Sequence, residues 1–293
     1  MIWWLSYTKQ QSTKTESLHR AIVLELNLID ASLYCLTGAF AGFAAGLLGI
    51  GGGLIIVPVL FFIFSSQGYE QQHLMHMALA TSLATIIITS ISSTLAHHKK
   101  RAVLWPTVLL LSPGICLGAW LGANFATQLD TSTLKPMFGL FEIFVACLMF
   151  GQYQSKNHQR TIKTSSGLIG GSIIGGISAI VGIGGGTLTV PFLHWHKINI
   201  KNAIATSAAC GLPIAIFATA SYTYSSWNLT DNISPGQQSM FGFIQIQAFL
   251  LIALCSFLFA PLGAKLAHTV SDVLLKKIFS IFLLLLGLKM LLS

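Results

Sequence analysis

Two short glycine clusters, GIGGG at residues 49–53 and GIGGG at residues 182–186, decide how this chain folds. Each cluster lies inside a long apolar block, and a proline (Pro58 or Pro191) follows five residues after its last glycine. A glycine in a helix interior costs about 1 kcal/mol relative to alanine. Four glycines within five residues therefore predict a broken helix at each cluster.

The apolar blocks predict helices that cross a membrane. Residues 31–69 carry no charge over 39 positions. As one helix they would extend about 58 Å, nearly twice the hydrocarbon core of about 30 Å. The other blocks with one charge or none are 74–96, 102–129, 136–155, 164–196, 202–228, 239–264 and 278–293. They lack the alternation of a membrane β-barrel, so the expected fold class is an all-α polytopic membrane protein.

The composition points to the same class of protein. The chain has 293 residues, of which 54% are hydrophobic and 8% charged, whereas a soluble domain has about 25% charged residues. A water-exposed surface cannot be built from so few charges, which argues against a soluble enzyme, a disordered chain and a nucleic-acid-binding protein. The net charge of +8 instead fits basic cytoplasmic loops.

The chain also contains an internal repeat. Residues 46–60 match 179–193, and 78–84 match 203–209, with Ala-Thr-Ser in both copies of the second pair. A third match, 121–123 with 262–264, follows in the same order. We therefore divide the chain into an N-terminal extension (1–30), a first transmembrane repeat (31–155), a basic linker (156–163) and a second transmembrane repeat (164–293).

The charge distribution favours inverted repeats. A glycine-broken helix pair plus three transmembrane helices gives each repeat an odd number of crossings, so the second repeat would be inverted. That arrangement places 11 Lys and Arg on one side and 5 on the other. Eight simple crossings would place 10 against 6. The positive-inside rule mildly favours the inverted arrangement. Eight simple crossings remain the alternative.

Two copies of G-x-G-G-G-x-x-x-x-P-x-L, each followed by an Ala-Thr-Ser segment, resemble the TauE/SafE family of sulfite and organosulfur anion exporters. The resemblance covers residues 31–292, and the extension 1–30 falls outside it. It implies a permease of the bacterial inner membrane that moves small sulfur-containing or carboxylate anions. It does not specify the substrate, the direction or the coupling ion.

The glycine clusters are also plausible anion sites on physical grounds. Consecutive glycines expose N–H groups that can bind an anion, and the N-terminus of the resumed half-helix favours negative charge. Broken helices hold substrates in many secondary transporters. The candidate substrate-binding residues are Gly49, Gly51, Gly52, Gly53, Thr81 and Ser82 in the first repeat, and Gly182, Gly184, Gly185, Gly186, Thr206 and Ser207 in the second. The alternative is that these glycines and hydroxyls serve helix packing and backbone hydrogen bonding.

Glu142 is the lone acid well inside an apolar block. An intramembrane carboxylate is a candidate for proton coupling, although the repeat places Leu283 at the corresponding position. The alternative is a neutral carboxyl group that is hydrogen-bonded to a neighbour or that lies nearer the membrane interface than hydropathy suggests.

The remaining expectations concern chemistry and partners. His73, His76, His194 and His196 lie at segment ends without clustered ligands, so no metal and no cofactor are expected. No catalytic motif is visible, which predicts a protein that is not an enzyme. The expected partners are a small anionic substrate and the lipid bilayer, without nucleic acid; a homodimer stays open. The alternatives to a transporter are an intramembrane enzyme, a scaffold or a channel.

Overall fold

The computed structural model describes residues 28–49, 51–150, 162–227, 240–267 and 272–292. A first helix, Leu28–Leu48, precedes the labelled elements. These are α2 (Gly53–Ser66), α3 (Leu74–Lys99), α4 (Trp105–Ala126), α5 (Thr131–Phe150), α6 (Thr164–Val181), α7 (Gly186–Trp195), α8 (Ile200–Ser226), β1 (Met240–Phe241), β2 (Ile244–Gln245), α9 (Ile246–Leu266) and α10 (Asp272–Leu292). Most of the extension 1–30 and of the linker 156–163 lies outside the described residues.

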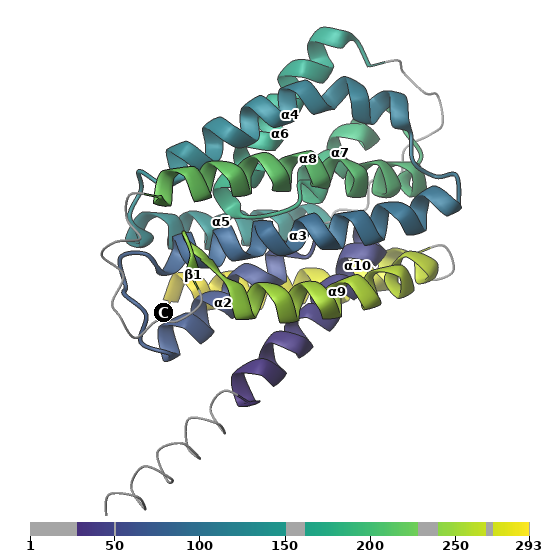
Figure 1. Cartoon of the computed structure of the whole chain (residues 1–293). Coiled ribbons are helices and arrows are strands. Elements are labelled where there is room, and N and C mark those ends of the chain that lie inside the picture. Colours follow the sequence, from purple (N-terminus) through teal and green to yellow (C-terminus); the bar gives the residue numbers. More distant parts are fainter. Residues whose placement is uncertain (1–27, 50, 151–161, 228–239, 268–271, 293) are drawn as a thin grey trace, which may run out of the picture.

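The helices lie side by side along one common direction (Figure 1). Seven of them are long and apolar enough to cross a membrane, and α2 is a shorter apolar helix. Large apolar side chains such as Leu109, Ile169 and Leu254 are exposed on the outside of the bundle, where lipid would cover them. The expected all-α polytopic membrane fold is confirmed.

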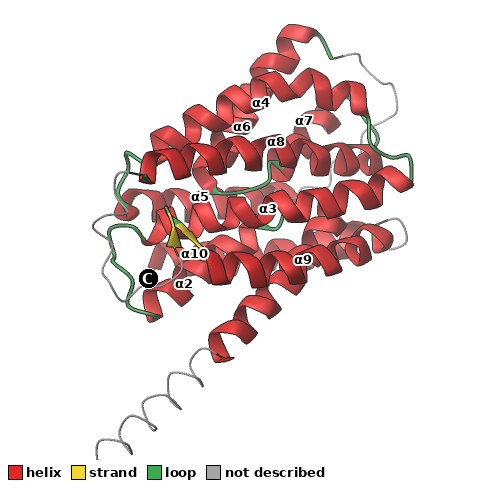
Figure 2. Ribbon diagram, viewed as in Figure 1, coloured by secondary structure: helices red, strands yellow, loops and turns green. Residues whose placement is uncertain are grey.

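Both glycine clusters interrupt helices, as predicted. The first helix ends at Leu48 and the chain resumes as α2 at Gly53. In the second repeat α6 ends at Val181 and α7 begins at Gly186. Figure 2 shows loop segments inside the bundle as well as at its ends. Each break therefore lies among helices, where its backbone groups are shielded from lipid.

Small residues bring several helices into backbone contact. Gly38, Gly42 and Gly46 of the first helix face Ile252, Ser256 and Ala260 of α9 in the same order. A Cβ atom placed on Gly42 would lie 2.5 Å from the Cα of Ser256. In the same way, Gly114, Gly118 and Gly122 of α4 face Leu168, Ser172 and Gly176 of α6. Close approach through small residues is typical of helix pairs in membranes.

One element was not expected from the sequence. Met240–Phe241 and Ile244–Gln245 form a short antiparallel hairpin, β1 and β2, directly before α9. The buried side chain of Gln245 caps α9 by accepting a hydrogen bond from the N–H of Ala248. The hairpin thus fixes the point at which the chain enters α9.

Candidate functional site

The two breaks share an unusual backbone conformation. Gly52 and Gly185 are the N-caps of α2 and α7, with φ angles of 78° and 74°. Gly49 and Gly182, which begin the two breaks, have φ angles of 69° and 71°. This left-handed backbone conformation is unfavourable for residues other than glycine. The glycines are therefore required by the turn that each break makes.

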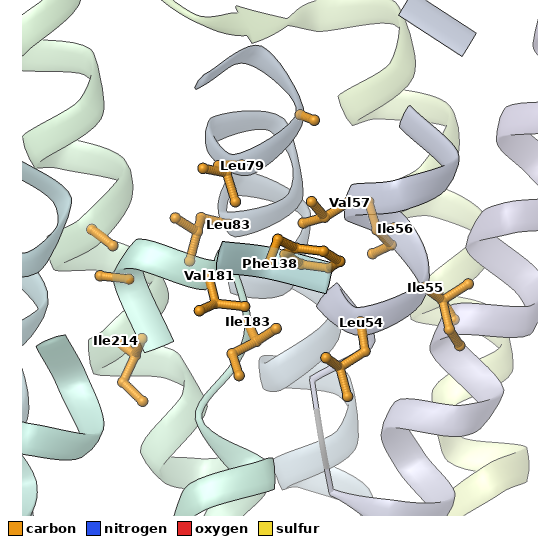
Figure 3. Packing of buried hydrophobic residues seen from close by; sticks show 14 of the residues in the cluster. Leu54, Ile55, Ile56, Val57, Leu79, Leu83, Phe138, Val181, Ile183 and Ile214 are labelled. Carbon is orange, nitrogen blue, oxygen red and sulfur yellow. The ribbon is translucent and has the colours of Figure 1, made fainter. Parts of the chain in front are cut away.

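The two breaks contact each other inside the bundle. A Cβ atom placed on Gly51 would lie 2.6 Å from the Cα of Gly184, and one placed on Gly184 would lie 2.9 Å from the Cα of Gly51. A Cβ atom on Gly53 would meet the carbonyl oxygen of Gly182. The backbones of the two repeats thus cross at Gly51 and Gly184, which we call the break crossing. Figure 3 shows apolar side chains of α2, α3 and the second break around this region.

The serines of the Ala-Thr-Ser segments tie each break to the opposite repeat. The Ser82 hydroxyl donates to the Gly182 carbonyl at 2.9 Å. The Ser207 hydroxyl donates to the Gly49 carbonyl at 3.1 Å, and also lies 2.8 Å from the Ile204 carbonyl. A hydroxyl has a single proton, so each serine that donates in this way can act toward a further ligand only as an acceptor.

The threonines of the same segments make a second matched pair of contacts. The Gln245 N–H donates to the Thr81 hydroxyl oxygen at 3.1 Å, and the Leu104 N–H donates to that of Thr206 at 3.1 Å. Gln245 and Leu104 are the N-caps of α9 and α4. Because both threonines accept in these contacts, their own protons stay available to a ligand. Sequence reasoning could not identify these partners, which lie in the opposite repeat.

The half-helix α7 begins with N–H groups that have no acceptor among the described residues. Its first backbone donors with an acceptor are Leu188 and Thr189, which both bond to the Gly185 carbonyl, so the N–H groups of Gly186 and Thr187 stay unpaired within the described part of the chain. Neither half-helix has a side-chain cap. Unpaired N–H groups and the helix dipole together make such ends attractive to anions.

Three buried hydroxyls near the second break were missed by the sequence reasoning. Ser178, Thr187 and Thr189 are at most 6% exposed, and their oxygens have no hydrogen-bond partner among the described residues. The sequence did contain a signal, because the corresponding residues of the first repeat are Ala45, Leu54 and Ile56. The two breaks are therefore chemically different.

Glu142 lies on α5 and faces Gly287 of α10. Its side chain is fully buried, and its Cβ atom lies 3.2 Å from where a Cβ atom on Gly287 would be. Neither carboxyl oxygen has a hydrogen-bond partner in the described chain. The hydrogen-bonded neighbour considered from the sequence is thus absent among the described residues.

The histidines occupy separate environments. His73 and His76 pack against each other and against Phe243, and His76 Nε2 lies 3.3 Å from the Ala126 carbonyl oxygen. The His196 ring contacts Phe192. Among the described residues, no group of three or more His, Cys, Asp or Glu could hold a metal ion.

Apolar spans and two broken helices that cross within the bundle define a multi-pass membrane protein of the kind found among secondary transporters. The family model described as "Sulfite exporter TauE/SafE" matches residues 34–290. The chain belongs to the TauE/SafE family.

Curated relatives carry names of the same class. A "Probable membrane transporter protein" of Haemophilus influenzae is 38% identical over 264 residues, covering 89% of this chain and 98% of the relative. One from Methanocaldococcus jannaschii is 30% identical over 267 residues, covering 90% and 97%. A Bacillus subtilis relative is 30% identical over 190 residues, covering 58% and 70%. No solved structure gives a significant match. The chain is thus a membrane transporter of this family.

Proposed function

We propose that this protein is a secondary transporter that exports a small anion, either sulfite or an organosulfur or carboxylate anion, and that it is not an enzyme. The observation that carries the proposal is the break crossing, where Gly51 and Gly184 meet beside two half-helix N-termini. Family membership and the relatives' names support transport. The "Sulfite exporter" description of the family supports the substrate class and the direction.

The electrostatics of the crossing suit transient anion binding. Residues 31–69 and 164–196, which contain the two breaks, hold no Lys or Arg. An anion at the crossing would meet helix dipoles, N–H groups and hydroxyls instead of a fixed cation. Such a site attracts negative charge without forming an ion pair, and a transporter must also release what it binds. We place the substrate at the candidate glycines, with the Thr81 and Thr206 hydroxyls as further donors.

We also propose that the two repeats are inverted and span the bacterial inner membrane. The contacts support this arrangement. The first helix and α3 both run parallel to α9. Gly42 of the first helix and Thr89 of α3 each contact Ser256, and along both helices later residues contact later residues of α9. Likewise α6 and α8 run parallel to α4. Consecutive spans joined by a short loop are expected to run antiparallel, and α3 and α4 are joined by residues 100–104. This supports opposite directions for the first helix and its counterpart α6.

Cysteine labelling tests the inverted arrangement. In a cysteine-free background, Gln71→Cys, between α2 and α3, should react with an impermeant thiol reagent added to intact cells. Trp195→Cys, an 82% exposed position at the end of α7, should react only after permeabilisation. Labelling of both positions from outside would instead support eight simple crossings.

Counterflow in liposomes tests the transport proposal. Reconstituted protein should exchange labelled sulfite or organic sulfonates, and Gly52→Val and Gly185→Val should abolish exchange. Valine cannot readily adopt the φ angles of 78° and 74° at these positions, because left-handed backbone is unfavourable for a β-branched residue. Both variants should remain inserted and monodisperse. Normal exchange by a well-folded Gly185→Val protein would place the site elsewhere in the bundle.

A further inference from the structure

Two buried hydroxyls of the second break, those of Ser178 and Thr189, lie around Gly185, and a third, that of Thr187, lies in the adjoining first turn of α7. If a Cβ atom is placed on Gly185, the Ser178 Oγ and Thr189 Oγ1 atoms each lie 3.5 Å from it. Thr187 lies between them in sequence, in the first turn of α7. Ser178 and Thr189 are fully buried, and Thr187 is 6% exposed. We call Ser178, Thr187 and Thr189 the hydroxyl triplet.

The triplet belongs to the buried hydroxyls that have no hydrogen-bond partner among the described residues, as do the hydroxyls of Ser93, Thr94 and Thr219. A serine or threonine in a membrane-spanning helix usually bonds to a carbonyl of its own helix. Thr37, Ser112 and Ser172 do so, each donating to the carbonyl four residues earlier at 2.7–3.0 Å. All three oxygens of the triplet lack a partner among the described residues. Burying an unpaired hydroxyl is unfavourable, and Ser178 and Thr189 lie against Gly185, the N-cap of α7. Their position at an anion-attracting helix end is the feature that points to a ligand.

The triplet is confined to one of the two repeats. The corresponding positions of the first repeat are Ala45, Leu54 and Ile56, which are also buried but carry no polar side-chain atom. Both breaks share their glycines and left-handed caps, so the shared backbone does not require hydroxyls at these positions. The polar group at the second break is therefore an addition to the common scaffold.

We infer that Ser178, Thr187 and Thr189, with the N-terminus of α7, form the selective half of the substrate site and bind the oxygen atoms of a singly charged oxyanion, such as a sulfonate. This inference rests on the proposed function and deepens it. Three hydroxyls and the N–H groups of Gly186 and Thr187 can all donate to oxygen. The first repeat supplies its own half-helix end, but its residues at the corresponding positions, Ala45, Leu54 and Ile56, have no hydroxyl.

The preference for a single charge follows from the helix dipoles. Each helix N-terminus is equivalent to about half a positive charge. Gly51 and Gly184 bring the ends of α2 and α7 together, so the pair offers about one positive charge in total. A monoanion is compensated by these ends, whereas a dianion would keep one uncompensated charge in a low-dielectric site, which is unfavourable. A neutral molecule of the same shape would gain little from the dipoles.

The experiment uses the full-length protein in liposomes and three tetrahedral sulfur compounds of different charge. Methanesulfonate carries one negative charge, sulfate carries two, and dimethyl sulfone is neutral. We expect uptake of labelled methanesulfonate, with weak competition by sulfate and none by dimethyl sulfone. Thr189→Val and Ser178→Ala should each weaken methanesulfonate binding roughly ten- to a hundredfold, the value of one hydrogen bond to a charged group.

Two matched variants separate ligand binding from structure. Ser172→Ala, on the same helix as Ser178, and Thr37→Val each remove a hydroxyl that bonds to its own helix. Both controls should leave methanesulfonate affinity unchanged. Thr189→Val and Ser178→Ala should not lower the melting temperature of the ligand-free protein, because these hydroxyls have no partner to lose.

The possible results separate this inference from the proposed function. If Thr189→Val and Ser178→Ala bind methanesulfonate like the wild type while Gly185→Val does not, the triplet assignment is wrong and the crossing remains the site. Equal uptake of sulfate and methanesulfonate would overturn the charge preference. If the wild-type protein transports none of the three compounds, the proposed ligand is wrong. Sulfite counterflow then decides separately whether the transport proposal stands.

Discussion

Gly51→Ala should disable the transporter by forcing the two breaks apart. The added Cβ atom would lie 2.6 Å from the Cα of Gly184, whereas carbon atoms pack at about 3.5–4.0 Å. The crossing backbones would have to separate by about 1 Å to reach that range. The φ angle of 78° at Gly51 adds strain, because left-handed backbone is unfavourable for alanine.

The expected energetic cost has two parts. Left-handed backbone costs a residue other than glycine about 1–2 kcal/mol, and overpacking a well-packed interior costs about 1–3 kcal/mol. Gly51→Ala should therefore lose about 2–5 kcal/mol of stability at the crossing. A large bundle can bear such a loss and still insert, so we expect folded protein with strongly reduced substrate exchange.

Two alanine variants separate the cost of backbone strain from the cost of the close contact between the breaks. Gly68, in the turn after α2, has a φ angle of 77° and no described atom within 4 Å of an added Cβ, so Gly68→Ala should carry the backbone strain alone and keep normal exchange. Gly184 lacks a positive φ but contacts Gly51, so Gly184→Ala should carry the contact alone and impair exchange. Thermal unfolding in detergent and liposome counterflow measure both properties. Wild-type exchange and stability in Gly51→Ala would refute the crossing as described.

Three further predictions concern other parts of the bundle. Gly118→Val should lower the melting temperature by pressing α4 against the Ser172 backbone, at a cost of about 1–3 kcal/mol; unchanged thermal unfolding would contradict this packing. Ser82→Ala and Ser207→Ala should each cost about 1–3 kcal/mol by leaving a break carbonyl unpaired, and unfolding curves that match the wild type would show that these bonds are dispensable. Glu142→Gln should leave proton-driven transport intact, and Glu142→Leu should raise the melting temperature by removing a buried group that has no partner; loss of the proton-driven component in Glu142→Gln would instead assign proton coupling to this residue.

The broken helices could be predicted because their cause is local. Glycine's cost in a helix depends on the residue itself, so the clusters at 49–53 and 182–186 mark the breaks without knowledge of any neighbour. The spans could be predicted for a similar reason, because hydropathy and length reflect the thickness of the membrane. Those properties need no information about which helices are adjacent.

The contacts between repeats could not be predicted in the same way. A helix that is apolar on every side does not show which face meets which neighbour. Nothing in the sequence around Ser82 therefore points to the Gly182 carbonyl, one hundred residues away. The same applies to Thr206, whose partner is the N–H of Leu104, and to Glu142, whose position between α5 and α10 depends on the packing of both helices.

The internal repeat also separates residues that build the site from residues that can define its ligand. The breaks and the Ala-Thr-Ser segments occur in both repeats, and their contacts come in matched pairs: Ser82 with Ser207, and Thr81 with Thr206. A feature that occurs in both repeats can be explained by its role in building the break crossing. Positions 45, 54 and 56 differ from 178, 187 and 189 although the backbones around them have the same caps, so the crossing tolerates different side chains there. If the triplet binds the ligand, changes of specificity should therefore be sought at these second-repeat positions, where a new side chain can alter the ligand's surroundings without removing the glycines on which the crossing depends.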